Sequence, residues 1–318
     1  MKRVLIVTAI ALGIWSGGTA RLSAFRAPET PSLPNFDRRL AHLSKQEAEL
    51  APDKAVAADE LRQRVPGLRI DVDRLLGTPN YLASSQSFLS GPNGQGGSIS
   101  SATANAFAAN DPQRALKAFL QEHAAMFGYG AEILETATVK RNYVTAHNGL
   151  RTTVWEQSFD GVGVFGMVLI SHVTKNGELA NVTVRLVPDL FRAVESGVPN
   201  YAQIKDALPV SARQAVVAAA QNVGDTLTID QVLALTEQPA GPEQEQKFNA
   251  RPALRGETIV KRSWLPMNGE VMRICYQVLL KSSSRKGEMY QLLVDAQSGE
   301  VLVRRCLTDH LQNITFNV

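Results

Sequence analysis

The sequence predicts an α+β fold made of two similar units, each an α-helix packed on an antiparallel β-meander. Three observations lead to this prediction. Residues 155–188 contain apolar-rich segments separated by Asp160-Gly161 and Asn176-Gly177, dipeptides that suit tight hairpins because they tolerate positive φ. A capped helical pattern precedes this meander. The same order of helix, strands and turn then returns in the second half of the chain.

The first unit begins with a helix whose limits are indicated by its capping residues. Asp111 is the expected N-cap, and Gly128 is expected to stop the helix. The apolar stripe between them should pack on a sheet. The strands that follow are expected at residues 135–143, 151–159, 164–173 and 178–187. In the last strand one buried face is expected from the alternation of Ala180, Val182, Val184 and Leu186 with polar residues.

The second unit repeats this plan after residue 210. Ser211 and Gln214 have the spacing of a capping box, and Gly224 is expected to end the helix. The greater length of this unit is assigned to a polar loop at residues 238–255. A Ser-Gly-Glu turn at residues 298–300 corresponds to the Asn-Gly-Glu turn of the first unit. Strands are expected at residues 257–264, 271–281, 288–295 and 301–305.

Residues 1–24 have the pattern of a secretory signal peptide. Two basic residues precede an apolar run at residues 4–15, and small residues follow, with cleavage expected after Ala20 or Ala24. A membrane anchor is the weaker alternative, because this run is shorter than the roughly 20 residues of a spanning helix. We therefore expect a secreted or periplasmic protein that is not held in a membrane after cleavage.

Residues 25–76 are interpreted as an adaptable, partly helical N-terminal arm. Helical runs are expected at residues 37–50 and 54–64, where Ala, Glu, Arg, Lys and Gln are frequent. Residues 91–102 are rich in Gly and Ser and show no apolar period. Disorder or a surface excursion is expected there.

Composition and cysteine content limit the function classes. With 318 residues and 44% hydrophobic residues, the chain can form two modest globular domains. The net charge of +3 includes basic residues of the signal region, so no nucleic-acid partner is indicated. Cys275 and Cys306 allow one disulfide. Free thiols are favoured, because a strand between the two would take their Cα atoms beyond the roughly 7 Å bridging limit.

The meander resembles the fungalysin/thermolysin propeptide (FTP) motif, which has an aromatic-rich strand, a D/K-G-[VI]-x-V-[FY]-G turn and an H-V-x-x-N-G strand pair. These elements stand here at residues 155–159, 160–166 and 172–177. The second unit resembles the PepSY domain, through its capped helix, a Y-x-V strand at residue 276 and a V-D-A-x-S-G-E-V hairpin at residue 294. The resemblances imply two cystatin-like units, an FTP-like domain at 77–200 and a PepSY-like domain at 201–308.

Both domains occur together in the pro-regions of fungalysin-type secreted zinc metallopeptidases. Activity in that family needs H-E-x-x-H on a helix, and here the five histidines are scattered singly. His123 lies on an apolar stripe and is expected to be a hydrogen-bonded core histidine, and His172 is expected to pack. We therefore expect no enzyme activity, catalytic residue, metal ligand or cofactor in this chain. Zinc is expected only in a missing catalytic domain.

Residues 309–318 look like the truncated junction between a pro-region and its catalytic domain. Partner contacts are expected at this junction and at the aromatic-bearing turn of the FTP motif, although a frayed tail and intramolecular packing are alternatives. The candidate contact residues are Phe159, Val164, Phe165, Leu311, Asn313, Ile314 and Thr315.

The sequence thus predicts a non-catalytic protein that binds, inhibits and assists the folding of a fungalysin-type metallopeptidase catalytic domain. Inhibition would be steric, so it would need no reactive group. One alternative is the N-terminal fragment of a secreted zinc metalloendopeptidase whose catalytic domain is missing. Another is a free-standing envelope binding protein of the FTP/PepSY type.

Overall fold

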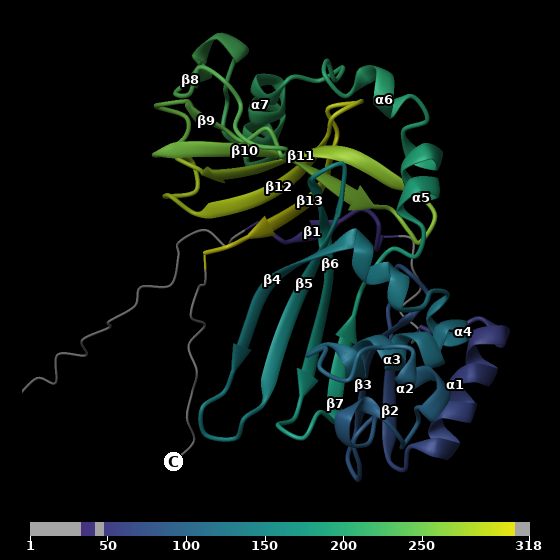
Figure 1. Ribbon diagram of the computed structural model, residues 1–318. Helices are drawn as coiled ribbons and strands as arrows, with labels where there is room; N and C mark the ends of the chain where they lie inside the picture. Colours follow the sequence, from purple (N-terminus) through teal and green to yellow (C-terminus); the bar gives the residue numbers. More distant parts are fainter. Residues whose placement is uncertain (1–32, 42–47, 309–318) are drawn as a thin grey trace, which may run out of the picture. The chain divides into compact units, whose positions relative to one another are not determined.

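The computed structural model describes residues 33–41 and 48–308, and its class is α+β, as predicted (Figure 1). The expected signal peptide lies outside the described residues. Within them, thirteen strands form one sheet. The strands are β1 (Phe36–Asp37), β2 (Leu68–Val72), β3 (Pro79–Ser84), β4 (Ala137–Val144), β5 (Arg151–Phe159), β6 (Val162–Val173), β7 (Leu179–Val184), β8 (Leu233–Ala234), β9 (Gln246–Asn249), β10 (Glu257–Pro266), β11 (Met272–Lys281), β12 (Met289–Asp295) and β13 (Val301–Cys306). The helices are α1 (Pro52–Arg64), α2 (Ser101–Asn105), α3 (Arg114–Glu122), α4 (Ala124–Phe127), α5 (Leu190–Gly197), α6 (Tyr201–Ile204) and α7 (Ala212–Val223), with 3-10 helices η1 (Pro92–Gly94), η2 (Ala131–Thr136) and η3 (Ile229–Gln231).

The first half-sheet has the strand order β2-β3-β7-β6-β5-β4, and every neighbouring pair is antiparallel. Its β4–β7 part is the predicted meander. Helices α1, α3 and α4 bury their apolar residues against one face, and Leu116 and Phe119 of the predicted stripe are fully buried there. Gly128 ends α4 with a φ of 84°, which confirms the predicted stop, since this left-handed conformation favours glycine.

The second half-sheet has the order β1-β13-β12-β11-β10-β9-β8, again with antiparallel neighbours. Helix α7 covers one face and has the predicted capping box of Ser211 and Gln214. Gly224 ends this helix with a φ of 93°. Strand β9 occupies part of the segment that the sequence assigns to a polar loop, where it pairs with β10. The cystatin-like character of the two units stays a prediction.

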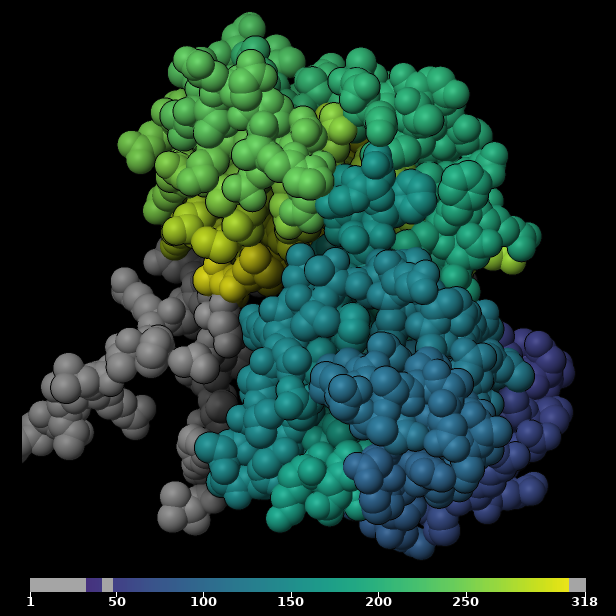
Figure 2. Space-filling model, viewed as in Figure 1, coloured from purple at the N-terminus to yellow at the C-terminus, as the bar shows by residue number. Residues whose placement is uncertain are grey.

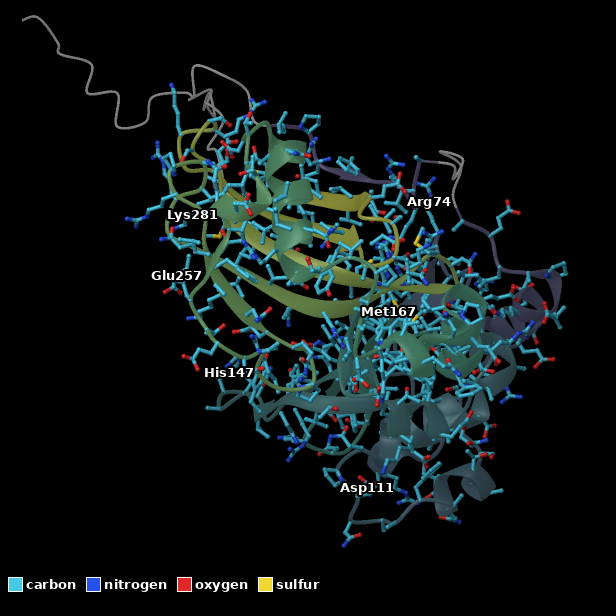
Figure 3. All side chains as sticks on the ribbon, turned by 90° about the horizontal axis from the view of Figure 1, so that it is seen from above. Arg74, Asp111, His147, Met167, Glu257 and Lys281 are labelled. Atoms are coloured by element: carbon cyan, nitrogen blue, oxygen red, sulfur yellow. The ribbon has the colours of Figure 1, made fainter. Side chains whose placement is uncertain are left out.

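Strand β6 joins the half-sheets. Its start pairs in parallel with β10, where Val164 is the Cα partner of Trp264, and the rest of the strand lies in the first half-sheet. Figure 2 shows the teal tip of the β5–β6 hairpin set among the green residues of the second half-sheet. The same strand therefore supplies both cores: Met167, labelled in Figure 3, belongs to the second core and Leu169 to the first.

The start of the first predicted helix is wrong. Asp111 is not the N-cap, because residues 111–113 form a turn and α3 begins at Arg114. The Asp111 carboxylate instead accepts from the Gln113 backbone N–H at 2.8 Å and pairs with Lys117 at 2.6 Å. These bonds stabilise a local turn that competes with helix capping. The helix is also broken at His123, whose φ of −108° and ψ of 28° are not helical.

The predicted alternation on β7 is wrong at one end. Val182, Val184 and Leu186 are buried as expected, but Leu179 rather than Ala180 faces the core. The β6–β7 register shifts between His172 and Val173, which leaves one extra residue on β7. A bulge of this kind reverses the facing of every residue beyond it.

The described parts of the N-terminal arm have more regular structure than the sequence predicts. Asp37 does not begin a helix: it lies in β1, which pairs with β13, and residues 38–41 form turns. Residues 42–47 lie outside the described part of the chain. Helix α1 confirms the expected run at 54–64. The Gly/Ser-rich residues 91–102 are not disordered, since they form η1 and part of α2, and the Gly94 N–H donates to the Gly177 carbonyl at 2.9 Å.

Candidate partner-binding surface

The first half-sheet has one face against its helices and one face that the described residues leave partly exposed. On the covered face, Trp155, Leu169 and Val184 lie in register on β5, β6 and β7 and are buried. On the opposite face, Val154 and Ile170 are only half-buried. We call this opposite side the open face.

Two rows of cross-strand partners make up the open face. A sheet places directly opposed residues about 5 Å apart, so each row is a continuous band of side chains. The central band is apolar in the middle and charged at both ends, and the neighbouring band is mainly polar. The central band consists of Asp71, Tyr81, Thr183, Ile170, Val154 and Arg141. The neighbouring band consists of Arg69, Ala83, Asn181, His172, Thr152 and Tyr143.

The candidate turn at Phe159 is held by the second half-sheet. Phe159 packs edge-on against Trp264, with ring centroids 5.7 Å apart, and Trp264 also meets Tyr201 at 4.7 Å. The Trp264 indole N–H donates to the Phe159 carbonyl at 3.2 Å. Val164 is 6% exposed within the same core. Two of the three candidate residues of this turn are therefore used for intramolecular packing.

Phe165 is the third candidate and stays half-buried at the junction. The guanidinium of Arg305 lies over its ring, 4.8 Å from the centroid. Phe165 also borders a polar cavity of about 200 Å³ between β6 and the second half-sheet. In its wall Lys261 and Glu243 form an ion pair at 2.7 Å. This corner of the open face can therefore offer an aromatic edge and hydrogen-bonding groups to a partner.

The other candidates lie at the C-terminus. Leu311, Asn313, Ile314 and Thr315 lie outside the described residues, so their contacts stay a prediction. The described chain ends beyond β13, where the Leu307 N–H donates to the Met289 carbonyl at 2.7 Å.

The two cysteines are free thiols on different strands of the second half-sheet. Cys275 lies on β11 and Cys306 on β13, and β12 lies between these strands. Burial raises the pKa of the Cys275 thiol well above its usual value. This thiol is therefore protonated and unreactive at neutral pH.

Two histidines have the structural settings that the sequence predicts. His123 is 8% exposed, and its Nε2 lies 3.1 Å from the Ser98 hydroxyl. Burial lowers the pKa of His123 to about 4, so the ring is neutral at pH 7. The His172 Nδ1 lies 3.0 Å from the Thr152 hydroxyl across the β5–β6 pair, and burial lowers its pKa.

Residues 33–41 and 48–308 contain no group of three or more His, Cys, Asp or Glu side chains placed to hold a metal ion. In the same part of the chain, no helix combines the length and apolarity needed to cross a bilayer.

Comparison with known proteins relates the meander to a peptidase propeptide. Residues 135–186 match the family described as Fungalysin/Thermolysin Propeptide Motif, and this segment comprises β4–β7. The chain is 25% identical over 193 residues to the thermolysins of Alicyclobacillus acidocaldarius subsp. acidocaldarius, Bacillus caldolyticus and Bacillus sp. (strain EA1). Each match covers 60% of this chain and 29% of the relative's length.

Among solved structures, the Bacillus megaterium YpeB C-terminal domain aligns with 82% of this chain and 99% of its own, at 10% identity. The TM-score of 0.28 is too low to establish a shared fold. The PepSY resemblance of the second unit stays a prediction. Residues 135–186 therefore match a peptidase propeptide motif, and over 193 residues the chain is similar to part of the thermolysins.

Proposed function

We propose that this chain binds the catalytic domain of a thermolysin-type peptidase, occludes its cleft and assists its folding. The observation that carries the proposal is that the propeptide motif coincides with the open face. Residues 135–186 supply Val154, Ile170 and Thr183 to its centre. An apolar centre with a polar rim is the usual anatomy of a protein interface, and such a surface needs no reactive group to block a cleft.

Three further parts of the proposal follow from the same relationship. The chain itself is non-catalytic and uses no cofactor, because steric inhibition requires neither catalytic residues nor a cofactor. It acts outside the cytoplasm, with neither nucleic acid nor membrane as partner. A PepSY-like, cystatin-like second unit would extend the contact surface beyond the first half-sheet.

The purified chain is expected to inhibit casein hydrolysis by mature thermolysin at micromolar concentration. Ile170→Glu should weaken this inhibition at least about 30-fold, since a charge at the centre of a water-excluding interface costs about 2 kcal/mol or more. Inhibition constants from steady-state hydrolysis rates would measure the effect.

Phe191→Glu is the matched control, because Phe191 is 69% exposed on α5, outside the propeptide motif. It should leave inhibition unchanged, and urea unfolding should show that both variants are folded. Equal inhibition by the Ile170→Glu protein would exclude the open face as the contact. No inhibition at micromolar concentration would favour a free-standing envelope binding protein. Hydrolysis by the chain alone, lost on chelation, would refute the non-catalytic role.

Folding assistance needs a separate measurement. Denatured mature thermolysin should regain more activity when refolded with the chain and then separated from it than when refolded alone. The Ile170→Glu protein should give a smaller gain. In the alternative of a peptidase fragment the same contacts would be made within one chain, and a reading frame that continues past Val318 into H-E-x-x-H would establish that alternative.

A further inference from the structure

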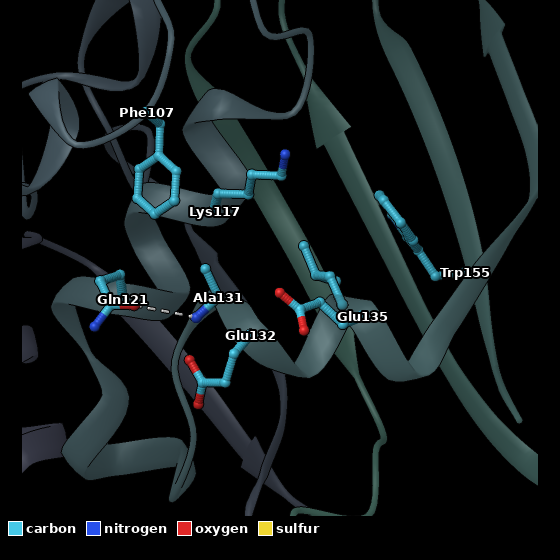
Figure 4. A pocket seen from close by; sticks show the side chains of 8 residues that line it. Phe107, Lys117, Gln121, Ala131, Glu132, Glu135 and Trp155 are labelled. Carbon is cyan, nitrogen blue, oxygen red and sulfur yellow. Dashed lines mark hydrogen bonds between the residues drawn. The ribbon is translucent and has the colours of Figure 1, made fainter. Parts of the chain in front are cut away.

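A second concave site lies on the covered side of the first half-sheet, away from the open face. It is a cavity of about 450 Å³ between α3, η2 and β5 (Figure 4). Phe107, Leu134 and Trp155 form its apolar wall. The volume lies in the range of sites that hold a small ligand or a large side chain.

Two carboxylates stand at the mouth of this cavity. Glu132 and Glu135 are three residues apart on η2, and side chains at this spacing eclipse one another in a 3-10 helix. Both are exposed. Glu132 accepts from the Gly130 backbone N–H at 2.6 Å, which orients its carboxylate, while Glu135 has no hydrogen bond or ion pair with any described residue. Two like charges from one 3-10 helix therefore line the same cavity.

Among the described residues that line the cavity, Lys117 is the one cation, and it does not neutralise this pair. Lys117 is engaged by Asp111, with Nζ and Oδ2 2.6 Å apart. In Figure 4 its amino group points away from Glu132 and Glu135. The cavity therefore combines an aromatic and apolar wall with uncompensated negative charge.

We propose that this cavity binds an arginine side chain presented by an extended segment of a partner protein. The aliphatic stem would lie against Phe107 and Leu134, and the guanidinium would contact the Trp155 ring while donating to the two carboxylates. Arginine fits better than lysine, because its planar group both stacks on an indole and bonds carboxylates in pairs. The Trp155 Nε1–H is buried without an acceptor among the described residues, so the indole ring in the cavity wall has an unpartnered polar atom.

This inference is independent of the peptidase role, because the cavity lies on the helix-covered side of the sheet and the open face on the other. A partner could occupy either surface without the other. Binding of an arginine peptide to this cavity can therefore be measured without a peptidase.

The test uses the full chain and two blocked tripeptides, acetyl-Ala-Arg-Ala-amide and its citrulline analogue, which replaces the guanidinium by a neutral urea of nearly equal shape. Calorimetric titration and NMR of the Trp155 indole would measure binding. The arginine peptide should bind and shift the indole signal. The citrulline peptide should bind about 10-fold more weakly, since charge-assisted hydrogen bonds are lost.

Glu135→Gln should weaken arginine binding about 5-fold to 10-fold, and added salt should weaken it in the unaltered chain. Glu60→Gln is the control, because Glu60 is exposed on α1 and does not line the cavity. Equal affinity for both peptides, unchanged affinity in the Glu135→Gln protein, or no arginine-peptide binding at 10 mM, which is roughly the limit of a useful side-chain site, would each overturn the proposal.

Discussion

Trp264→Ala is expected to lower the free energy of unfolding by about 4 kcal/mol, as large-to-small changes of buried aromatic residues do. Trp264 is fully buried, packs against Phe159 and Tyr201, and donates to the Phe159 carbonyl. It also stands where β10 meets β6, so its loss leaves a cavity at the joint of the two half-sheets. Urea denaturation followed by circular dichroism would measure the change in midpoint.

Two comparison variants make this result interpretable. Trp264→Phe keeps a ring in the site and should cost about 1 to 2 kcal/mol, for the lost hydrogen bond and the smaller volume. Phe191→Ala removes an exposed ring and should change stability by less than about 0.5 kcal/mol. A loss below about 1 kcal/mol for Trp264→Ala would mean that the joint is not part of the cooperative core. A lower m value would indicate that the half-sheets unfold separately.

The second large effect is a loss of stability on acidification that depends on His123. In the folded protein burial holds the pKa of His123 at about 4, whereas in the unfolded chain it returns to its ordinary value of 6.5. Between these values the unfolded chain binds a proton that the folded chain does not bind. The contribution of His123 to the free energy of unfolding is therefore fully present above about pH 7. It falls by about 3 kcal/mol as the pH drops to 4.

The variant His123→Gln isolates this contribution, because glutamine can still bond the Ser98 hydroxyl but does not titrate. Other groups also titrate near pH 4, so the relevant quantity is the difference between the two proteins. Unfolding free energies measured from pH 7.5 to 4 should fall more steeply for the unaltered chain. Parallel pH profiles would contradict the assigned pKa, as would an NMR titration of the His123 ring with a midpoint near 6.5.

Local features of the fold could be predicted because they depend on residues close in sequence. The capping box at Ser211 and the terminal glycines at residues 128 and 224 act within one helical turn. Asp160-Gly161 has the predicted positive φ at both positions, while at Asn176-Gly177 only the glycine does. The helix start at Arg114 and the bulge at Ala180 were missed. In both cases a shift of one or two residues costs little free energy locally, so tertiary contacts decide the position.

The candidate site was predictable only in part. The propeptide motif indicates a segment, but its pattern does not reveal which side of each strand meets a helix layer. Phe159 and Val164 are apolar, and apolar residues occur both in docking surfaces and in cores. Their burial depends on contacts with a strand about 100 residues away in the sequence. The central band of the open face was missed, although the alternation of Val154 and Ile170 with buried neighbours is its signal.

By itself, the sequence determined the α+β class, the order of helix and meander strands in each unit, the glycines that end α4 and α7, and the resemblance of the first meander to a peptidase propeptide motif. Only the tertiary structure decided that β6 joins both half-sheets, that β1 completes the second one, and that the cavity at Trp155 has two carboxylates at its mouth. The reason is physical. Backbone hydrogen bonds are the same for any residue, so which distant strands pair is decided by the packing of complete side-chain layers.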